Sequence, residues 1–191
     1  MKKVIFSVLV IIVVILCSFA VLCFQSPKTL PDGTIEIDFM KDRPNWLASR
    51  ILYNYVLKEV KMSPKEAKDA NIVPSAVKAY FVDLNDDGKK EIIGIVNSSF
   101  YIGSAGHSLI VMEGNFSDLK DITLYLSFAT QDKFYVSTNK TSGYRDIKYT
   151  FSHSCISAFV EAKYTNGYYY SKQAYDAFKK SLSDYSCFKS E

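Results

Sequence analysis

The feature that most constrains this chain is an uninterrupted apolar segment near its amino end. Residues 4–24 contain no charged side chain, and Lys2 and Lys3 directly precede them. At about 1.5 Å of rise per residue, a helix of this length just crosses a hydrocarbon core of about 30 Å. We therefore predict a transmembrane signal anchor over residues 1–24, with a cytoplasmic N-terminus and a domain that is periplasmic or extracellular.

A cleaved signal peptide is the alternative for the same segment. Ser18 and Ala20 are small residues at a cleavage spacing, after an apolar region of suitable length. Cleavage there would leave an apolar mature end at residues 21–24, which favours the uncleaved anchor. Both interpretations place the rest of the chain outside the cytoplasm.

Charge in the exported part is almost balanced. Without Lys2 and Lys3, 21 basic residues remain against 20 acidic ones. This balance supports no general affinity for polyanions, so we expect no nucleic-acid partner. The expected partners are the membrane, through the N-terminal helix, and another envelope protein or a component of the wall.

Cys155 and Cys187 are the two cysteines outside the apolar segment. An even number of cysteines in an oxidising compartment is typical of a disulfide. Closing a loop of about 30 residues in this way would contribute on the order of 3 kcal/mol. Two buried, unpaired thiols are the alternative, and the lack of any CxxC pair argues against zinc.

Two helices are predicted before the β-rich part of the chain. Residues 25–40 contain two prolines and a glycine and indicate a spacer with one short strand. Apolar residues then recur at helical spacing over residues 47–60, which predicts a helix that lies on a core, with Asp42 as its cap. Ser63 and Glu66 have the spacing of a capping box and predict a second, short helix.

From residue 76 the apolar pattern becomes that of β-strands. Short runs rich in β-branched and aromatic residues alternate with Gly, Asn, Asp or Ser, which predicts a mainly antiparallel, meandering sheet. Asn166-Gly167 is a strong signal for a two-residue hairpin, and apolar spacing after residue 171 predicts a closing helix. The predicted fold class is therefore α+β: a transmembrane helix, one or two helices on the sheet and a C-terminal helix, with residues 41–191 as the extracytoplasmic domain.

One loop concentrates oxygen donors between two apolar runs. Asp83, Asn85 and Asp87 alternate, a glycine follows, and Glu91 lies four residues after Asp87. Calcium takes roughly six to eight oxygen ligands at about 2.3–2.6 Å. Alternate residues of a tight loop can turn their oxygens to one centre, and the carbonyl of Lys89 can add another. We therefore predict a structural Ca²⁺ site at Asp83, Asn85, Asp87, Lys89 and Glu91.

A solvated turn is the alternative for this loop, because Asp, Asn and Gly favour turns for local backbone reasons. The alternation, the glycine and the distal Glu91 all favour the cation site, and the like charges would otherwise repel within one hairpin. The side chains of Asp86, Lys89 and Lys90 are expected to point to solvent. An EF-hand is excluded because its closing glutamate would fall at Gly94.

The residues D-L-N-D-D-G-K-K-E-I-I resemble the calcium loops of FG-GAP/VCBS-type segments. The resemblance implies Asp83, Asn85, Asp87, the Lys89 carbonyl and Glu91 as ligands, and it covers about ten residues, so it implies no propeller. Together with "YIGSAGHSLIVME" and "TSGYRDI", the loop is also similar to small exported bacterial proteins of unassigned function. These pair one acidic loop with a Gly-rich hairpin.

The sequence contains no strong catalytic signature. His153 and Cys155 would share one face of a strand, but no third group that could orient the histidine is marked, and no GxSxG motif occurs. Arg145-Asp146 predicts a turn followed by an ion pair. We predict a binding or interaction domain of the envelope, such as an inhibitor or adaptor. A hydrolase with acids dispersed over several strands is the alternative, and a cavity holding two carboxylates would favour it.

Overall fold

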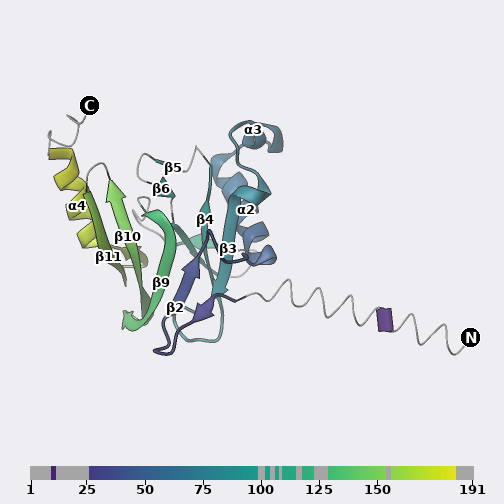
Figure 1. Cartoon of the computed structure of the whole chain (residues 1–191). Helices are drawn as coiled ribbons and strands as arrows, with labels where there is room; N and C mark the ends of the chain where they lie inside the picture. The colour runs from purple at the N-terminus through teal and green to yellow at the C-terminus, as the bar shows by residue number, and fades with distance from the viewer. Residues whose placement is uncertain are drawn as a thin grey trace, which may run out of the picture.

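The computed structural model describes residues 10–11, 26–98, 102–103, 106–107, 109–114, 118–122, 129–153 and 156–183. Helices α2 and α3 cover one face of a four-stranded sheet, and a larger sheet packs on its other face (Figure 1). The predicted α+β class is confirmed, but two antiparallel sheets replace the single predicted sheet. The helices are α2 (Trp46–Val60), α3 (Pro64–Asp69), the short 3-10 helix η1 (Pro74–Ala76) and α4 (Lys172–Ser183).

The larger sheet has the strand order β1-β2-β9-β10-β11-β12, and a β5–β6 hairpin joins it through β9. Residue 37 of β2 lies opposite residue 134 of β9, and both side chains are fully buried. The segment 25–40, predicted as a spacer, therefore contributes two strands, and the folded domain begins before residue 41. The strands are β1 (Lys28–Thr29), β2 (Ile35–Asp38), β5 (Ile102–Gly103), β6 (Gly106–His107), β9 (Ala129–Thr141), β10 (Tyr144–His153), β11 (Ile156–Thr165) and β12 (Tyr168–Tyr170).

The smaller sheet has the order β3-β4-β7-β8. The inner strand β4 is buried along its whole length, because alternate side chains face the core between the sheets and the core under α2. At Gly94 the helix comes so close that an added Cβ would lie 2.5 Å from Leu52 Cδ2. Glycine at this position therefore sets the distance between helix and sheet. The strands are β3 (Val77–Val82), β4 (Glu91–Val96), β7 (Leu109–Glu113) and β8 (Lys120–Asp121).

The start of α2 covers the open edge of β3. Asn45 caps the helix, since its Oδ1 accepts a hydrogen bond of 2.9 Å from the backbone N–H three residues on. The prediction of Asp42 as the cap is wrong, because its carboxylate accepts the N–H of Asp38 instead. Asn45 N–H donates to Ala79 O, and Ser49 Oγ accepts Ala79 N–H, both at 3.0 Å. These bonds satisfy an edge that could otherwise pair with another chain.

Local signals elsewhere in the sequence are confirmed. Ser63 and Glu66 form the capping box of α3. Asn166 and Gly167 take φ values of 54° and 85° in the turn between β11 and β12, as a type I′ hairpin requires. The closing helix is α4, which packs Ala174 against the core between the sheets.

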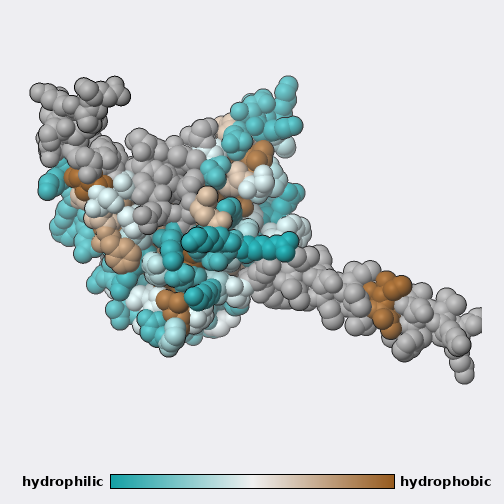
Figure 2. Space-filling view, in the orientation of Figure 1, coloured by the Kyte–Doolittle hydropathy of each residue, from teal (hydrophilic) through white to brown (hydrophobic). Residues whose placement is uncertain are grey.

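Several predictions fall outside the described residues. These include Cys155, Cys187 and most of the apolar segment 4–24. In the part of the chain that the structure describes, no helix is both long and apolar enough to span a membrane. The face of the domain in Figure 2 is mostly hydrophilic and carries only small apolar patches.

Candidate cation site and adjoining cavity

The loop between β3 and β4 is folded by hydrogen bonds from its own side chains to its backbone. The two carboxylate oxygens of Asp83 accept the N–H groups of Asp86 at 2.7 Å and Gly88 at 3.0 Å. Asn85 and Asp87 each accept the N–H two residues on, at 3.1 and 2.7 Å. Asp86 and Gly88 have φ values of 62° and 82°, the left-handed conformation that lets the chain wrap. The alternate side chains therefore bond to the backbone of their own loop, which the turn alternative also predicts.

Glu91, the first residue of β4, is the buried acid of this loop. Glu91 is only 6% exposed, and its Oε2 accepts the N–H of Leu84 at 2.7 Å. Burial raises the pKa of the Glu91 carboxyl to about 7, and the charges of Asp87 and Asp83 act in the same direction. Among the described residues, no basic side chain forms an ion pair with Glu91. A carboxyl in this setting requires a proton or a cation.

The sequence predicts that the Asp86 side chain points to solvent. In the structure it instead forms ion pairs. Its carboxylate pairs with Lys140 Nζ at 2.5 Å and with the Arg145 guanidinium at 3.0 Å, and these two partners hold its pKa below the usual range. Arg145 N–H also donates to Leu84 O at 2.6 Å. The predicted ion pair after the turn therefore forms with Asp86. It fastens the outer side of the loop to the β9–β10 hairpin.

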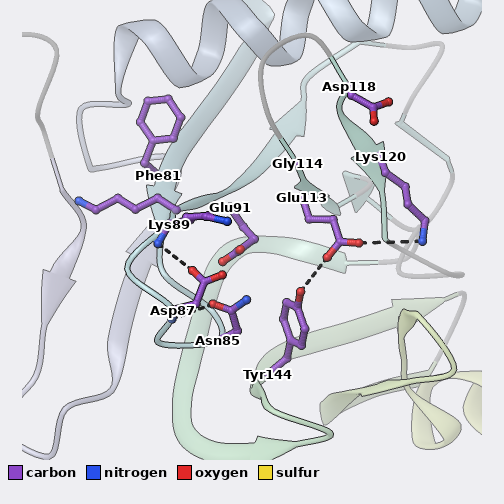
Figure 3. Close-up of a pocket in the computed structure, with 11 residues that line it drawn as sticks. Phe81, Asn85, Asp87, Lys89, Glu91, Glu113, Gly114, Asp118, Lys120 and Tyr144 are labelled. Carbon is purple, nitrogen blue, oxygen red and sulfur yellow. Dashed lines mark hydrogen bonds and ion pairs between the residues drawn. The ribbon is translucent and has the colours of Figure 1, made fainter.

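An open cavity of about 650 Å³ lies beside the loop (Figure 3). Asn85, Asp87 and Glu91 lie on one side, and Glu113 from the end of β7 and Tyr144 from the start of β10 lie on the other. The Tyr144 phenol donates to Glu113 Oε2 at 2.7 Å. Burial and this hydrogen bond raise the pKa of Tyr144. The cavity thus brings together carboxylates from the loop, β4 and β7.

Glu113 and Tyr144 were not identified from the sequence. The Tyr144 ring stacks on Tyr164 with ring centroids 4.0 Å apart, and Lys120 Nζ lies 3.9 Å from Glu113 Oε1. Tyr144 and Glu113 are 31 residues apart in the chain, so no linear motif joins them. A local signal exists only for Tyr144, which follows directly on the Ser142-Gly143 turn.

Four of the five predicted calcium ligands, Asn85, Asp87, Lys89 and Glu91, line this cavity. Asp83 lines a smaller cavity of about 300 Å³. Among the described residues, no three His, Cys, Asp or Glu side chains are grouped so that they alone could hold a metal ion. A cation here would depend on a mixed set of carboxylate, amide and backbone carbonyl oxygens, which is the set that calcium accepts.

Comparisons of the chain with protein-family models, with curated proteins and with solved structures find no match. The function must therefore be argued from the geometry of the loop and of the cavity beside it.

Proposed function

We propose that this protein is a membrane-anchored, extracytoplasmic binding domain whose β3–β4 loop holds a structural calcium ion. The observation that carries the cation site is the buried Glu91, which lies beside Asp83 and Asp87 without a basic partner among the described residues. A divalent cation would relieve both the desolvation of Glu91 and the repulsion among the three carboxylates.

The donor set supports calcium over other metals. The five predicted ligands would bind through oxygen atoms, as hard cations require, and a softer metal would need the histidine nitrogen or cysteine sulfur that this loop lacks. The ion pairs of Asp86 with Lys140 and Arg145 act on the outer side of the loop. The inner oxygens can therefore bind an ion without loss of the contact to the hairpin.

Thermal unfolding of the full-length protein in detergent micelles tests this site. The midpoint should rise in millimolar CaCl₂ relative to EDTA, because an ion that binds only the folded state stabilises it. Asp87→Ala should abolish the rise. Asp118→Ala is the matched control, since Asp118 is an exposed acid at the same cavity but outside the loop. Equal midpoints of the wild type in calcium and in chelator would refute the cation site.

The proposed location and partners follow from the apolar segment and from the charge balance. The N-terminal helix would hold the chain in the membrane, and the domain would contact another envelope protein or a wall component as an inhibitor or adaptor. Protease added to spheroplasts, in which the outer face of the cytoplasmic membrane is accessible, should digest the domain and spare the cytoplasmic amino end. Protection of the whole chain until the cells are lysed would contradict the proposed topology.

A hydrolase of envelope polymers is the second candidate, and one observation favours it. Glu91 and Glu113 line the same cavity in unlike environments: Glu91 is buried with a pKa of about 7, and Glu113 is hydrogen-bonded by Tyr144. Two such carboxylates are used in acid–base cleavage of glycosidic bonds. New reducing ends released from a wall polymer by the wild type, but not by Glu91→Gln, would establish the hydrolase. We expect no release.

A further inference from the structure

A second cavity adjoins the one beside the loop. It has a volume of about 830 Å³ and lies between α2 and β8, with Tyr168 of β12 at its wall. Asp118 and Lys120 line both cavities. The two cavities together, which we call the β8 groove, therefore extend from the β3–β4 loop across β8 to α2. A groove of this extent is suited to a chain of several linked units.

Aromatic rings lie in both halves of the β8 groove. Tyr144 is held in the first half by its hydrogen bond to Glu113 and its stacking on Tyr164. Tyr168, in the second half, is 38% exposed, and Lys120 Nζ lies 5.6 Å from the centre of its ring. An exposed tyrosine ring offers a flat apolar face with a polar end. Such a face suits a sugar ring, whose C–H groups gather on one side and whose hydroxyl groups surround its edge.

The charges that line the groove nearly cancel. The first cavity is lined by four carboxylates and three lysines. The second cavity has three carboxylates and two lysines. Neither half attracts a strongly charged ligand. A neutral ligand with many hydroxyl groups can instead use both kinds of side chain, because carboxylates accept and ammonium groups donate hydrogen bonds.

A peptide is a poorer occupant for this groove. Peptides are commonly bound by strand addition at a free sheet edge or by side chains inserted into apolar pockets. One edge of the smaller sheet, β3, is covered by Asn45 and Ser49 at the start of α2, and the other edge, β8, has only the two residues Lys120 and Asp121, which is too short for strand addition. The first cavity is lined mainly by charged and amide side chains.

We propose that the β8 groove binds a neutral oligosaccharide. The inference rests on the proposed role as a binding domain, and it names the class of ligand that this domain would bind. Glu113, fixed by Tyr144 and adjacent to Lys120, accepts hydrogen bonds from sugar hydroxyl groups in the first half. Tyr168 stacks on a sugar ring in the second half. Because β8 lies between the two cavities, consecutive sugar units of one oligosaccharide contact both halves of the groove.

Binding of chitotetraose and cellotetraose tests the proposal, with tetra-alanine as the peptide probe. The full-length protein is kept in CaCl₂ and in a detergent without a sugar headgroup, and binding is followed by saturation-transfer NMR and calorimetry. We expect at least one tetrasaccharide to bind. Tyr168→Ala and Glu113→Gln should each weaken binding about tenfold, as loss of a stacking face or of a hydrogen bond to a charged group does. Phe159→Ala is the matched control, because Phe159 is 61% exposed on the outer face of β11.

Each outcome separates the ligand from the cation site. If calcium raises the unfolding midpoint but neither sugar binds, the oligosaccharide proposal is overturned and the cation site stands. If a sugar binds but calcium does not change the unfolding midpoint, the cation site is refuted and the oligosaccharide proposal stands. Binding of tetra-alanine in place of the sugars, or sugar binding that neither groove variant weakens, also overturns the proposal.

Discussion

In chelator, the stability of the folded domain should fall as the pH rises from about 5 to about 8, and Glu91→Gln should remove this contribution. The fold raises the pKa of the Glu91 carboxyl from 4.5 to about 7. Between these values the folded state keeps a proton that the unfolded chain has released. Because the folded state then binds more protons, raising the pH favours unfolding. The stabilisation is fully present below the unfolded pKa and is lost as the pH rises through 7.

The size of the effect follows from the two pKa values. Their difference, at about 1.4 kcal/mol for each pH unit, corresponds to at most about 3 kcal/mol of unfolding free energy. Most of this falls between about pH 5 and about pH 8. Urea unfolding in EDTA, followed by the near-ultraviolet circular dichroism of the tyrosines, measures it. Saturating calcium should flatten the wild-type profile, because the ion replaces the proton.

The Glu91→Gln protein is the internal reference for this experiment. Glutamine keeps an oxygen that can accept the Leu84 N–H, and both proteins contain the same two histidines, whose titration cancels in the comparison. The difference between the two pH profiles therefore reports Glu91 alone. Parallel profiles of the two proteins in EDTA would refute the argument that Glu91 is buried without a counter-charge.

Three further substitutions test the packing and the attachment of the loop, each by urea unfolding. Gly94→Ala should destabilise the domain by roughly 1–3 kcal/mol, because the new Cβ would lie 2.5 Å from Leu52 Cδ2 and 2.7 Å from the Lys78 carbonyl oxygen; unchanged stability would contradict the close helix–sheet contact. Asn45→Ala should cost about 1 kcal/mol through loss of the α2 cap, and unchanged stability would contradict the capping role of Asn45. Asp86→Asn should cost at most about 1 kcal/mol, and less at high salt, because its ion pairs are partly exposed; a larger, salt-independent loss would contradict this.

Elements encoded by neighbouring residues could be predicted from the sequence. Ser63 and Glu66 identify the start of α3 because their capping box closes within four residues. Asn166-Gly167 identifies the last hairpin because both residues tolerate positive φ. The β3–β4 loop belongs to the same class, since its side chains bond to backbone groups only two to five residues away.

Features that join distant parts of the chain could not be predicted. The carboxylate of Asp86 pairs with Lys140 and Arg145, which lie 54 and 59 residues further along the chain. The sequence pattern does not distinguish these two residues from the other lysines and arginines. The larger sheet is extended by the pairing of β2 with β9, about 100 residues later. The cap of α2 was misassigned because Asp42 and Asn45 can both cap. The choice was made by tertiary structure, through the contact of Asn45 N–H with β3.

The ion pairs of Lys140 and Arg145 with Asp86 also affect how the β3–β4 loop would respond to an ion. Together with the hydrogen bonds of the loop's own side chains to its backbone, these ion pairs shape the loop without an ion, so an ion that bound there would order little additional chain. Lys140, Arg145 and Tyr144 all belong to the β9–β10 hairpin. A movement of the loop that displaced this hairpin would therefore also displace Tyr144 at the wall of the groove.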